Sequence, residues 1–448
     1  MKKIRIGSGA GYAGDRLEPA LDLMQNANLD YICFECLAER TIAMAQQEKM
    51  HQPDLGYNAM FTYRMERVLP LAMEKGVKVI TNMGAANPEA ALQKAYEIAQ
   101  KQGIKKIKIA AVLGDQVLSL VQQTPDLKIL ESGATLETLK ERIFSANAYL
   151  GVAPILAALE ADADIIITGR VADPSLFLAP MIHAFGWDLT NYDLLGKGTL
   201  VGHLLECAGQ LCGGYFADTQ KKQVPKLEHL GFPYAEINAV GEGFVSKLEK
   251  SGGSVTTATC TEQLLYEIHD PAAYITPDCV ADFSAVEFSP LANNKIAFSK
   301  ATGKAATAFY KVSVGYKNGF IGEGQISYAG ADCLERAKWA AQLVQQRIQS
   351  LHPQLLPLDI DYIGWNSVTP NPKKTSAPPT EVRLRVAGKT NTRAEAQHIA
   401  NEVEALYTNG PAGGGGASKK LEALVSIASV LLPKDQIDVQ LIFKEINT

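Results

Sequence analysis

A histidine and a glutamate lie three residues apart in the segment His203-Leu-Leu-Glu206-Cys207. We expect this segment to belong to a helix over residues 198–211, in which positions 203, 206, 207 and 210 share one face. A histidine and a carboxylate at this spacing can form an acid–base pair or supply two ligands to a metal ion. The alternatives without chemistry are a solvated helix face and a histidine packed in the core. The segment makes His203 and Glu206 candidates for catalysis.

Polar side chains also follow four of the expected strands. Glu35, Asn82, Asp115 and Arg170 each come directly or shortly after a short apolar run. Ligands of open parallel sheets bind beyond the carboxyl ends of the strands, so these residues are expected to converge on one cleft. Arg170 follows a glycine, and a guanidinium fixed at such a place suits a carboxylate or a phosphate.

These observations predict one cleft with a floor and a wall. Glu35, Asn82 and Arg170 would form the floor, and His203 and Glu206 would form the wall. We expect Glu35 to be a third catalytic group, because a carboxylate at the cleft floor can also transfer a proton. The predicted substrate-binding residues are Arg170, Asn82 and Asp115.

The first glycine cluster, Gly9-Ala-Gly11-Tyr-Ala-Gly14, is a complete G-x-G-x-x-G after the first expected strand. Glu35 then stands where a dinucleotide enzyme keeps its ribose-binding acid, so Gly9, Gly11 and Gly14 are candidates for cofactor binding. The alternative is a tight strand-to-helix turn in which Asp15 caps the following helix. The second interpretation is favoured, because Asp15 and Arg16 place charges where small apolar residues usually allow the helix to pack. NAD is therefore not the expected cofactor.

The second glycine cluster comprises Gly413, Gly414, Gly415 and Gly416. Such a run is typical of a flexible connector. It could also present its N–H groups to an anion beside Lys419 and Lys420, as a lid or a phosphate-binding loop. We keep the four glycines as candidates for substrate binding.

The seven cysteines are irregularly spaced. Cys33 and Cys36 form one C-x-x-C, but it lies in an apolar run and no second pair completes a zinc site. We expect reduced, packed cysteines and no metal site.

Composition excludes several classes of protein. The chain has 448 residues, 47% of them apolar, and 43 basic against 48 acidic residues. This balance does not fit a nucleic-acid-binding protein. No apolar run approaches the about 20 residues needed to span a bilayer, and no signal-peptide core follows Met1. We expect a cytoplasmic protein without nucleic-acid or membrane partners.

The order of the elements predicts an α/β fold. Residues 1–225 alternate strands and helices, which is typical of a three-layer, Rossmann-like domain on a mostly parallel sheet. The strands near residues 29–34, 77–81 and 107–113 should be neighbours in that sheet. Residues 226–350 should form a β-rich domain, and 351–448 an α+β, ferredoxin-like unit with the glycine-rich loop. Residues 373–380 should form an exposed loop.

Taken together, these segments resemble the acyclic terpene utilisation (AtuA) family over nearly the whole chain. The resemblance rests on ordered matches spread along the sequence: Arg5 to Asp15, Leu37 to Thr41, Ile80 to Gly84, Asn87 to Glu89, Asn147 to Gly151, Ile167 to Arg170, His203 to Cys207, Glu262 to Pro271 and Tyr407 to Gly416.

The resemblance implies a place in the breakdown of terpenes or branched acids. The first functional expectation is a lyase or hydratase acting on a small carboxylated or acyl-CoA substrate. The second is a non-catalytic acyl-CoA- or anion-binding partner of a carboxylase-type assembly, and the third is an NAD-dependent oxidoreductase. We also expect a homo-oligomer, because symmetric assembly is common among cytoplasmic enzymes and would cover exposed strand edges.

Overall fold

The computed structural model describes residues 2–369 and 379–447, which divide into two compact units. Unit 1 comprises residues 1–315 and 427–448, and unit 2 comprises Tyr316–Ser426. These limits differ from the expected boundaries at 225 and 350, and the three-part division stays a prediction. Most of the expected exposed loop at 373–380 lies outside the described residues.

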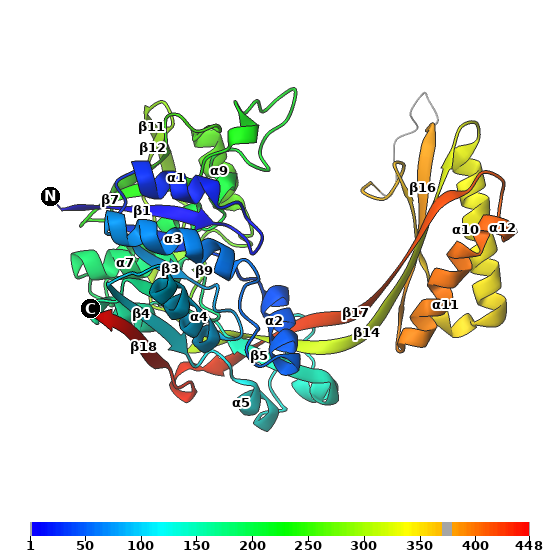
Figure 1. Ribbon diagram of the computed structural model, residues 1–448, viewed down its shortest axis with the longest axis horizontal. Helices are drawn as coiled ribbons and strands as arrows, with labels where there is room; N and C mark the ends of the chain where they lie inside the picture. Colours follow the sequence, from blue (N-terminus) through cyan, green and yellow to red (C-terminus); the bar gives the residue numbers. More distant parts are fainter. Residues whose placement is uncertain (1, 370–378, 448) are drawn as a thin grey trace. The chain divides into compact units, whose positions relative to one another are not determined.

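Unit 1 is built on a mixed sheet that has ten strands in the described part of the chain (Figure 1). Its centre is parallel, in the order β1 (Lys3–Ala10), β2 (Tyr31–Phe34), β3 (Lys78–Thr81), β6 (Ile165–Ile167) and β4 (Lys106–Leu113). The remaining five strands are antiparallel to their neighbours: β7 (Pro233–Asn238), β8 (Gly243–Lys247), β12 (Lys295–Ser299) and β11 (Glu287–Ala292) beyond β1, and β18 (Gln440–Asn447) beyond β4.

This sheet confirms the α/β class and corrects two details. The sheet is mixed rather than mostly parallel, because strands from the expected β-rich segment extend it beyond β1. The strands β2 and β3 are neighbours as expected, but β6 lies between β3 and β4. β6 pairs with β3 and β4, which lie far from it in the sequence, and no local sequence pattern predicts which strands it will pair with.

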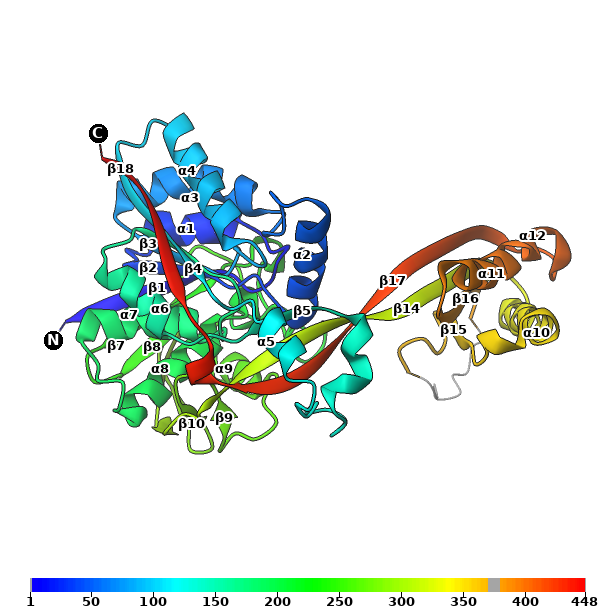
Figure 2. The same cartoon turned by 90° about the horizontal axis from the view of Figure 1, so that it is seen from below.

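Helices cover both faces of this sheet, as the two views show (Figures 1 and 2). One face carries α1 (Glu18–Asn26), α3 (Phe61–Lys75) and α4 (Pro88–Lys101), and the other carries α6 (Ala153–Glu160) and α7 (Ser175–Phe185), with α8 (Tyr192–Leu205) packed on α7.

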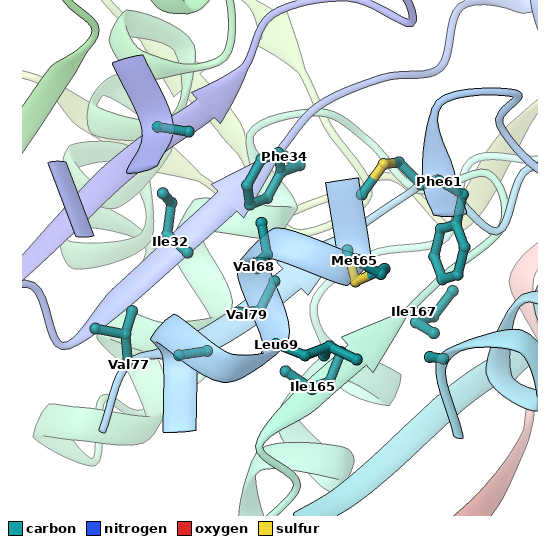
Figure 3. Close-up of a cluster of buried hydrophobic side chains, with 14 of the residues drawn as sticks. Ile32, Phe34, Phe61, Met65, Val68, Leu69, Val77, Val79, Ile165 and Ile167 are labelled. Carbon is teal, nitrogen blue, oxygen red and sulfur yellow. The ribbon is translucent and has the colours of Figure 1, made fainter. Parts of the chain in front are cut away.

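Successive side chains of β2 point to opposite faces of the sheet, so this strand contacts both helix layers. Ile32 and Phe34 point into a buried cluster with Met65 and Val68 of α3 (Figure 3). Between them, Cys33 faces α7 and its thiol donates to the Leu176 carbonyl. A strand buried on both faces reads as a continuous apolar run, as this one does.

Unit 2 has the element order β-α-β-β-α-β. The elements are β14 (Phe309–Ala329), α10 (Cys333–Leu351), β15 (Asp359–Ile363), β16 (Glu381–Thr390), α11 (Arg393–Glu404) and β17 (Gly415–Pro433), and the sheet order is β15-β16-β14-β17. This is the ferredoxin-like arrangement. It begins before residue 351, because β14 and α10 supply its first strand and helix. Strands β14 and β17 each contribute residues to both units.

The other elements of unit 1 are α2 (Glu39–His51), α5 (Leu118–Gln123), β5 (Ile143–Ala148), α9 (Thr257–Leu265) and a small sheet of β13 (Thr302–Lys304), β10 (Val280–Asp282) and β9 (Tyr274–Ile275). Unit 2 also contains α12 (Leu406–Asn409). Within the described residues, none of the helices is both long and apolar enough to cross a bilayer.

Candidate functional site

A cavity of about 610 Å³ in unit 1 borders the loops that follow β1 and β2. Its other walls come from the residues after β6, the end of α8 and the segment after α9. Six carboxyl side chains line it: Asp15, Glu35, Glu39, Asp173, Glu206 and Glu267. Among the described lining residues, Arg16 alone carries a positive charge. The cavity is therefore acidic, with apolar patches such as Leu230 and Phe232 between the carboxyl groups.

His203 stands behind Glu206 and does not reach the cavity itself. The His203 side chain is 1% exposed, its Nδ1 lies 2.7 Å from Oε1 of Glu206, and its Nε2 lies 3.2 Å from the Leu264 carbonyl oxygen. A carbonyl only accepts, so Nε2 carries a hydrogen. Nδ1 and Oε1 of Glu206 consequently share one exchangeable proton.

Glu206 lines the cavity, and its second oxygen has no partner among the described residues. The residue is 7% exposed, and Oε2 is buried without a hydrogen-bond partner in this part of the chain. Burial raises the pKa of Glu206 to about 7, although the neighbouring His203 opposes the shift. Burial alone would lower the pKa of His203, but the Glu206 carboxylate outweighs it and the pKa is raised. An unpartnered carboxyl oxygen with such a pKa is suited to proton transfer near neutral pH.

Glu35 lines the same cavity and is held by Asn82. Asn82 Nδ2 donates to Glu35 Oε1 over 2.9 Å, and the backbone N–H of Leu37 donates to the same oxygen over 2.8 Å. Asn82 Oδ1 in turn accepts from the backbone N–H of Cys36. Burial, with the charge of Asp173, raises the pKa of Glu35 well above its ordinary value. Asn82 is fully buried and positions Glu35, and its contact with the substrate stays a prediction.

Arg170 is turned into the protein and does not line the cavity. The side chain is 1% exposed, and its guanidinium donates to the carbonyls of Leu37 and Val171 and to Oδ1 of Asp173. A buried guanidinium needs its own partners, and these carbonyls and Asp173 supply them. Its contact with a substrate anion stays a prediction. Arg170 acts on the cavity from behind, through Asp173 and Leu37, which line it, and through its charge, which opposes the rise in the pKa of Glu35.

Asp115 is also buried away from the cavity. Its Oδ2 accepts from the backbone N–H of Arg170 over 2.9 Å and from Asn147 Nδ2 over 2.8 Å. The residue fixes the turn after β6, and its contact with the substrate stays a prediction.

Packing requires two of the glycines of the G-x-G-x-x-G segment, Gly9 and Gly11. A Cβ on Gly11 would lie 2.5 Å from the carbonyl carbon of Cys207, and one on Gly9 would lie 2.7 Å from the Phe34 ring. The backbone N–H of Gly11 donates to Asp15 Oδ2 over 2.9 Å. The loop's own carboxylate thus occupies an N–H group that a phosphate would need. Asp15 closes this loop and does not cap α1, so the expectation of a cap was wrong.

The second glycine cluster belongs to unit 2. Gly413 and Gly416 have positive φ angles, and Gly415 is the first residue of β17. Every residue that lines the acidic cavity belongs to unit 1. A substrate-binding role for the glycine cluster stays a prediction.

The described cysteines are free thiols, and no group of three metal-ligating side chains is placed to hold an ion in residues 2–369 and 379–447. Cys36 accepts a hydrogen bond from the buried Arg64 guanidinium over 3.0 Å.

Sequence reasoning missed several of the lining carboxyl groups. Asp173 precedes α7, which begins at Ser175, and pairs with Arg170. Residues 170–173 are not helical, so their spacing of three residues gave no signal for this pair. Glu39 and Glu267 likewise carry no signal in the sequence.

These features define an α/β protein with an acidic cavity beside the parallel strands. The family model described as acyclic terpene utilisation family protein AtuA matches residues 4–443. The chain therefore belongs to the AtuA family.

No protein of curated function matches the chain. A solved structure, the de novo designed protein Ferredog-Diesel, is 17% identical over a match that covers 24% of this chain and 88% of that chain, with a TM-score of 0.15.

Proposed function

We propose that this protein is a lyase or hydratase in which Glu206 transfers a proton to or from a substrate in the acidic cavity. The observation that carries the proposal is the state of the Glu206 side chain. One oxygen is held by His203, and the other is buried at the cavity wall without a partner. Its pKa of about 7 lets it both accept and release a proton near neutral pH.

The second group needed for a dehydration is Glu35. Its Oε1 accepts two N–H groups, so when Glu35 is neutral its proton resides on Oε2. In the proposed step, ionised Glu206 takes the proton from the carbon next to a carbonyl. The C–H electrons form the new C=C bond as the C–O bond breaks, and the departing hydroxyl takes the proton of Glu35 and leaves as water. Two carboxyl groups in different protonation states divide the roles of base and acid.

The charge of the cavity favours an acyl ester over a free acid. A substrate carboxylate placed beside Asp173 and ionised Glu206 would meet like charge, because Arg170 is committed to other partners. A neutral thioester avoids this repulsion and leaves the single proton of Glu35 for the departing hydroxyl. Among the substrates expected, acyl-CoA esters therefore suit this site better than small free acids.

Deuterium exchange tests the proposal without knowledge of the complete reaction. The protein is incubated in D₂O with branched acyl-CoA thioesters and with their free acids, and mass spectrometry follows deuterium at the carbon next to the carbonyl. We expect exchange into at least one thioester, and the Glu206→Gln variant should slow it by about 10²- to 10⁴-fold. Glu249→Gln, at an exposed position outside the cavity, is the matched control.

The outcomes separate the three functional classes. Thioester binding without exchange or turnover, with co-purification of another subunit, would favour the non-catalytic partner. Reduction of added NAD⁺ would favour the oxidoreductase. Exchange that persists unchanged in Glu206→Gln would refute the role given to Glu206.

A further inference from the structure

A second hollow opens beside the acidic cavity and has a different chemical character. Its volume is about 320 Å³, and it shares Ala13, Leu37 and Thr41 with the acidic cavity. The two spaces therefore adjoin along these residues. The further walls of the second hollow come from α2 and from the segment that leads into α3.

The polar side chains of this hollow are engaged within the protein. Thr41 Oγ1 bonds both the N–H and the carbonyl of Ala38, and Asn58 donates to the Ala13 carbonyl and accepts from the backbone N–H of Met60. The Cys36 thiol accepts from Arg64. These groups have little capacity left for a polar ligand, so the hollow offers carbon surface. Glu48 is exposed and can remain in water while the hollow is filled.

Apolar residues complete the walls. Met44, on α2, is 50% exposed, and Ala45 and Ala59 leave room beside it. A methionine side chain is flexible and polarisable, and it adapts to apolar ligands of varied shape.

We infer that this hollow binds the aliphatic tail of the molecule whose reacting group occupies the acidic cavity. The inference rests on the proposed function for the link between the two spaces. It adds a substrate class: an acyl compound with a hydrocarbon chain that passes over Ala13 and Leu37 toward Met44. Ala45 and Ala59 are then the residues that limit the length of the chain.

Binding of plain alcohols tests the inference without any catalysis. Protein labelled with [methyl-¹³C]methionine is titrated with n-alkanols of increasing length and observed by NMR. We expect the Met44 methyl signal to shift, with affinity rising about fourfold for each added methylene until the hollow is full. Met50, also on α2 and 65% exposed but outside the hollow, supplies the reference signal.

Filling the hollow provides the second arm. Ala45→Leu should remove binding of the longer alkanols, whereas Gln47→Leu on the same helix should not. Ala59→Leu, at an exposed position before α3, gives the same test should Ala45→Leu fail to fold. Equal shifts at Met44 and Met50, or binding that Ala45→Leu and Ala59→Leu leave unchanged, would overturn the inference.

The two proposals fail in different ways. Glu206→Gln should leave alkanol binding intact, because Glu206 does not line this hollow. Alkanol binding without deuterium exchange would thus refute the proposed reaction only, and exchange without alkanol binding would refute the tail site only.

Discussion

Nδ1 of His203 and Oε1 of Glu206 lie 2.7 Å apart on consecutive turns at the end of α8, and this contact couples the two ionisations. Burial raises the pKa of Glu206 from its ordinary 4.5 to about 7. The Glu206 carboxylate raises the pKa of His203 above its ordinary 6.5, although burial opposes it. The folded protein therefore binds protons at this pair more tightly than the unfolded chain does.

The first prediction is the sign of the pH dependence of folding. Stability from this pair is fully present below about pH 4.5 and is lost as the pH rises through about 7. We expect the urea midpoint of the wild-type protein to fall more between these two pH values than that of Glu206→Gln, which cannot ionise. Glu249→Gln should follow the wild type. The prediction would be contradicted if the urea midpoints of the wild type and of Glu206→Gln changed equally with pH.

The second prediction concerns His203 as a positioning residue. Loss of the imidazole in His203→Asn removes the group that lowers the pKa of Glu206. The pH at which deuterium exchange reaches half its maximum should consequently move upward. A purely structural role would reduce the rate at every pH without moving this midpoint.

The third prediction concerns the pair of the buried Arg170 and the half-buried Asp173. Arg170→Met leaves Asp173 without its partner, and the loss of stability should stay below the about 3–5 kcal/mol of a fully buried pair, because solvent reaches Asp173. The double variant Arg170→Met/Asp173→Asn should recover part of this loss. Urea unfolding of both single variants and of the double variant gives the coupling free energy between the two side chains. Arg393→Met, at an exposed position, is the control. Strictly additive losses would show that the two side chains do not interact.

The fourth prediction distinguishes packing from cofactor binding in the first glycine loop. Gly11→Ala places a methyl group against the Cys207 backbone and should cost about 1–3 kcal/mol of stability. Gly14→Ala meets only the Tyr12 side chain, at 3.2 Å, and should be nearly neutral. Thermal unfolding measures the change in stability of both variants. A Gly14→Ala variant that folds normally but loses affinity for NAD would revive the dinucleotide interpretation.

The fifth prediction concerns the second glycine cluster. A Cβ on Gly415 meets no atom within 4 Å and its φ is not positive, so Gly415→Ala should be neutral or stabilising by about 0.4–1 kcal/mol. Gly416→Ala must adopt a φ of 63° and should cost about 1–2 kcal/mol. Deuterium exchange unchanged in Gly415→Ala would fit a connector, whereas a slowed rate would support the predicted lid.

Local patterns in the sequence were enough to predict the α/β class and some of the residues that lie near the cavity. Glu35 and Glu206 line it, and Asn82 holds Glu35, because polar residues at strand and helix ends collect at one edge of a parallel sheet. Asn87 caps α4 as its spacing before Pro88 indicates.

Long-range pairing could not be predicted in the same way. The insertion of β6 between β3 and β4 depends on which partner a short apolar strand finds. The direction of the Arg170 side chain depends on the carbonyl groups of Leu37 and Val171, and no sequence pattern indicates these contacts. For the same reason His203 was assigned to the cavity wall, although the side chain lies one layer behind Glu206.

The interruption of unit 1 by unit 2 has a consequence for synthesis on the ribosome. Unit 2 is a continuous stretch, Tyr316–Ser426, whereas β18 completes the large sheet only when residues 440–447 pair with β4. The β4 edge thus stays open while more than a hundred further residues are added. An open strand edge is a template for wrong pairing with other chains. The nascent protein should therefore depend on chaperones most strongly in this interval, which ends only after the ferredoxin-like unit has been synthesised.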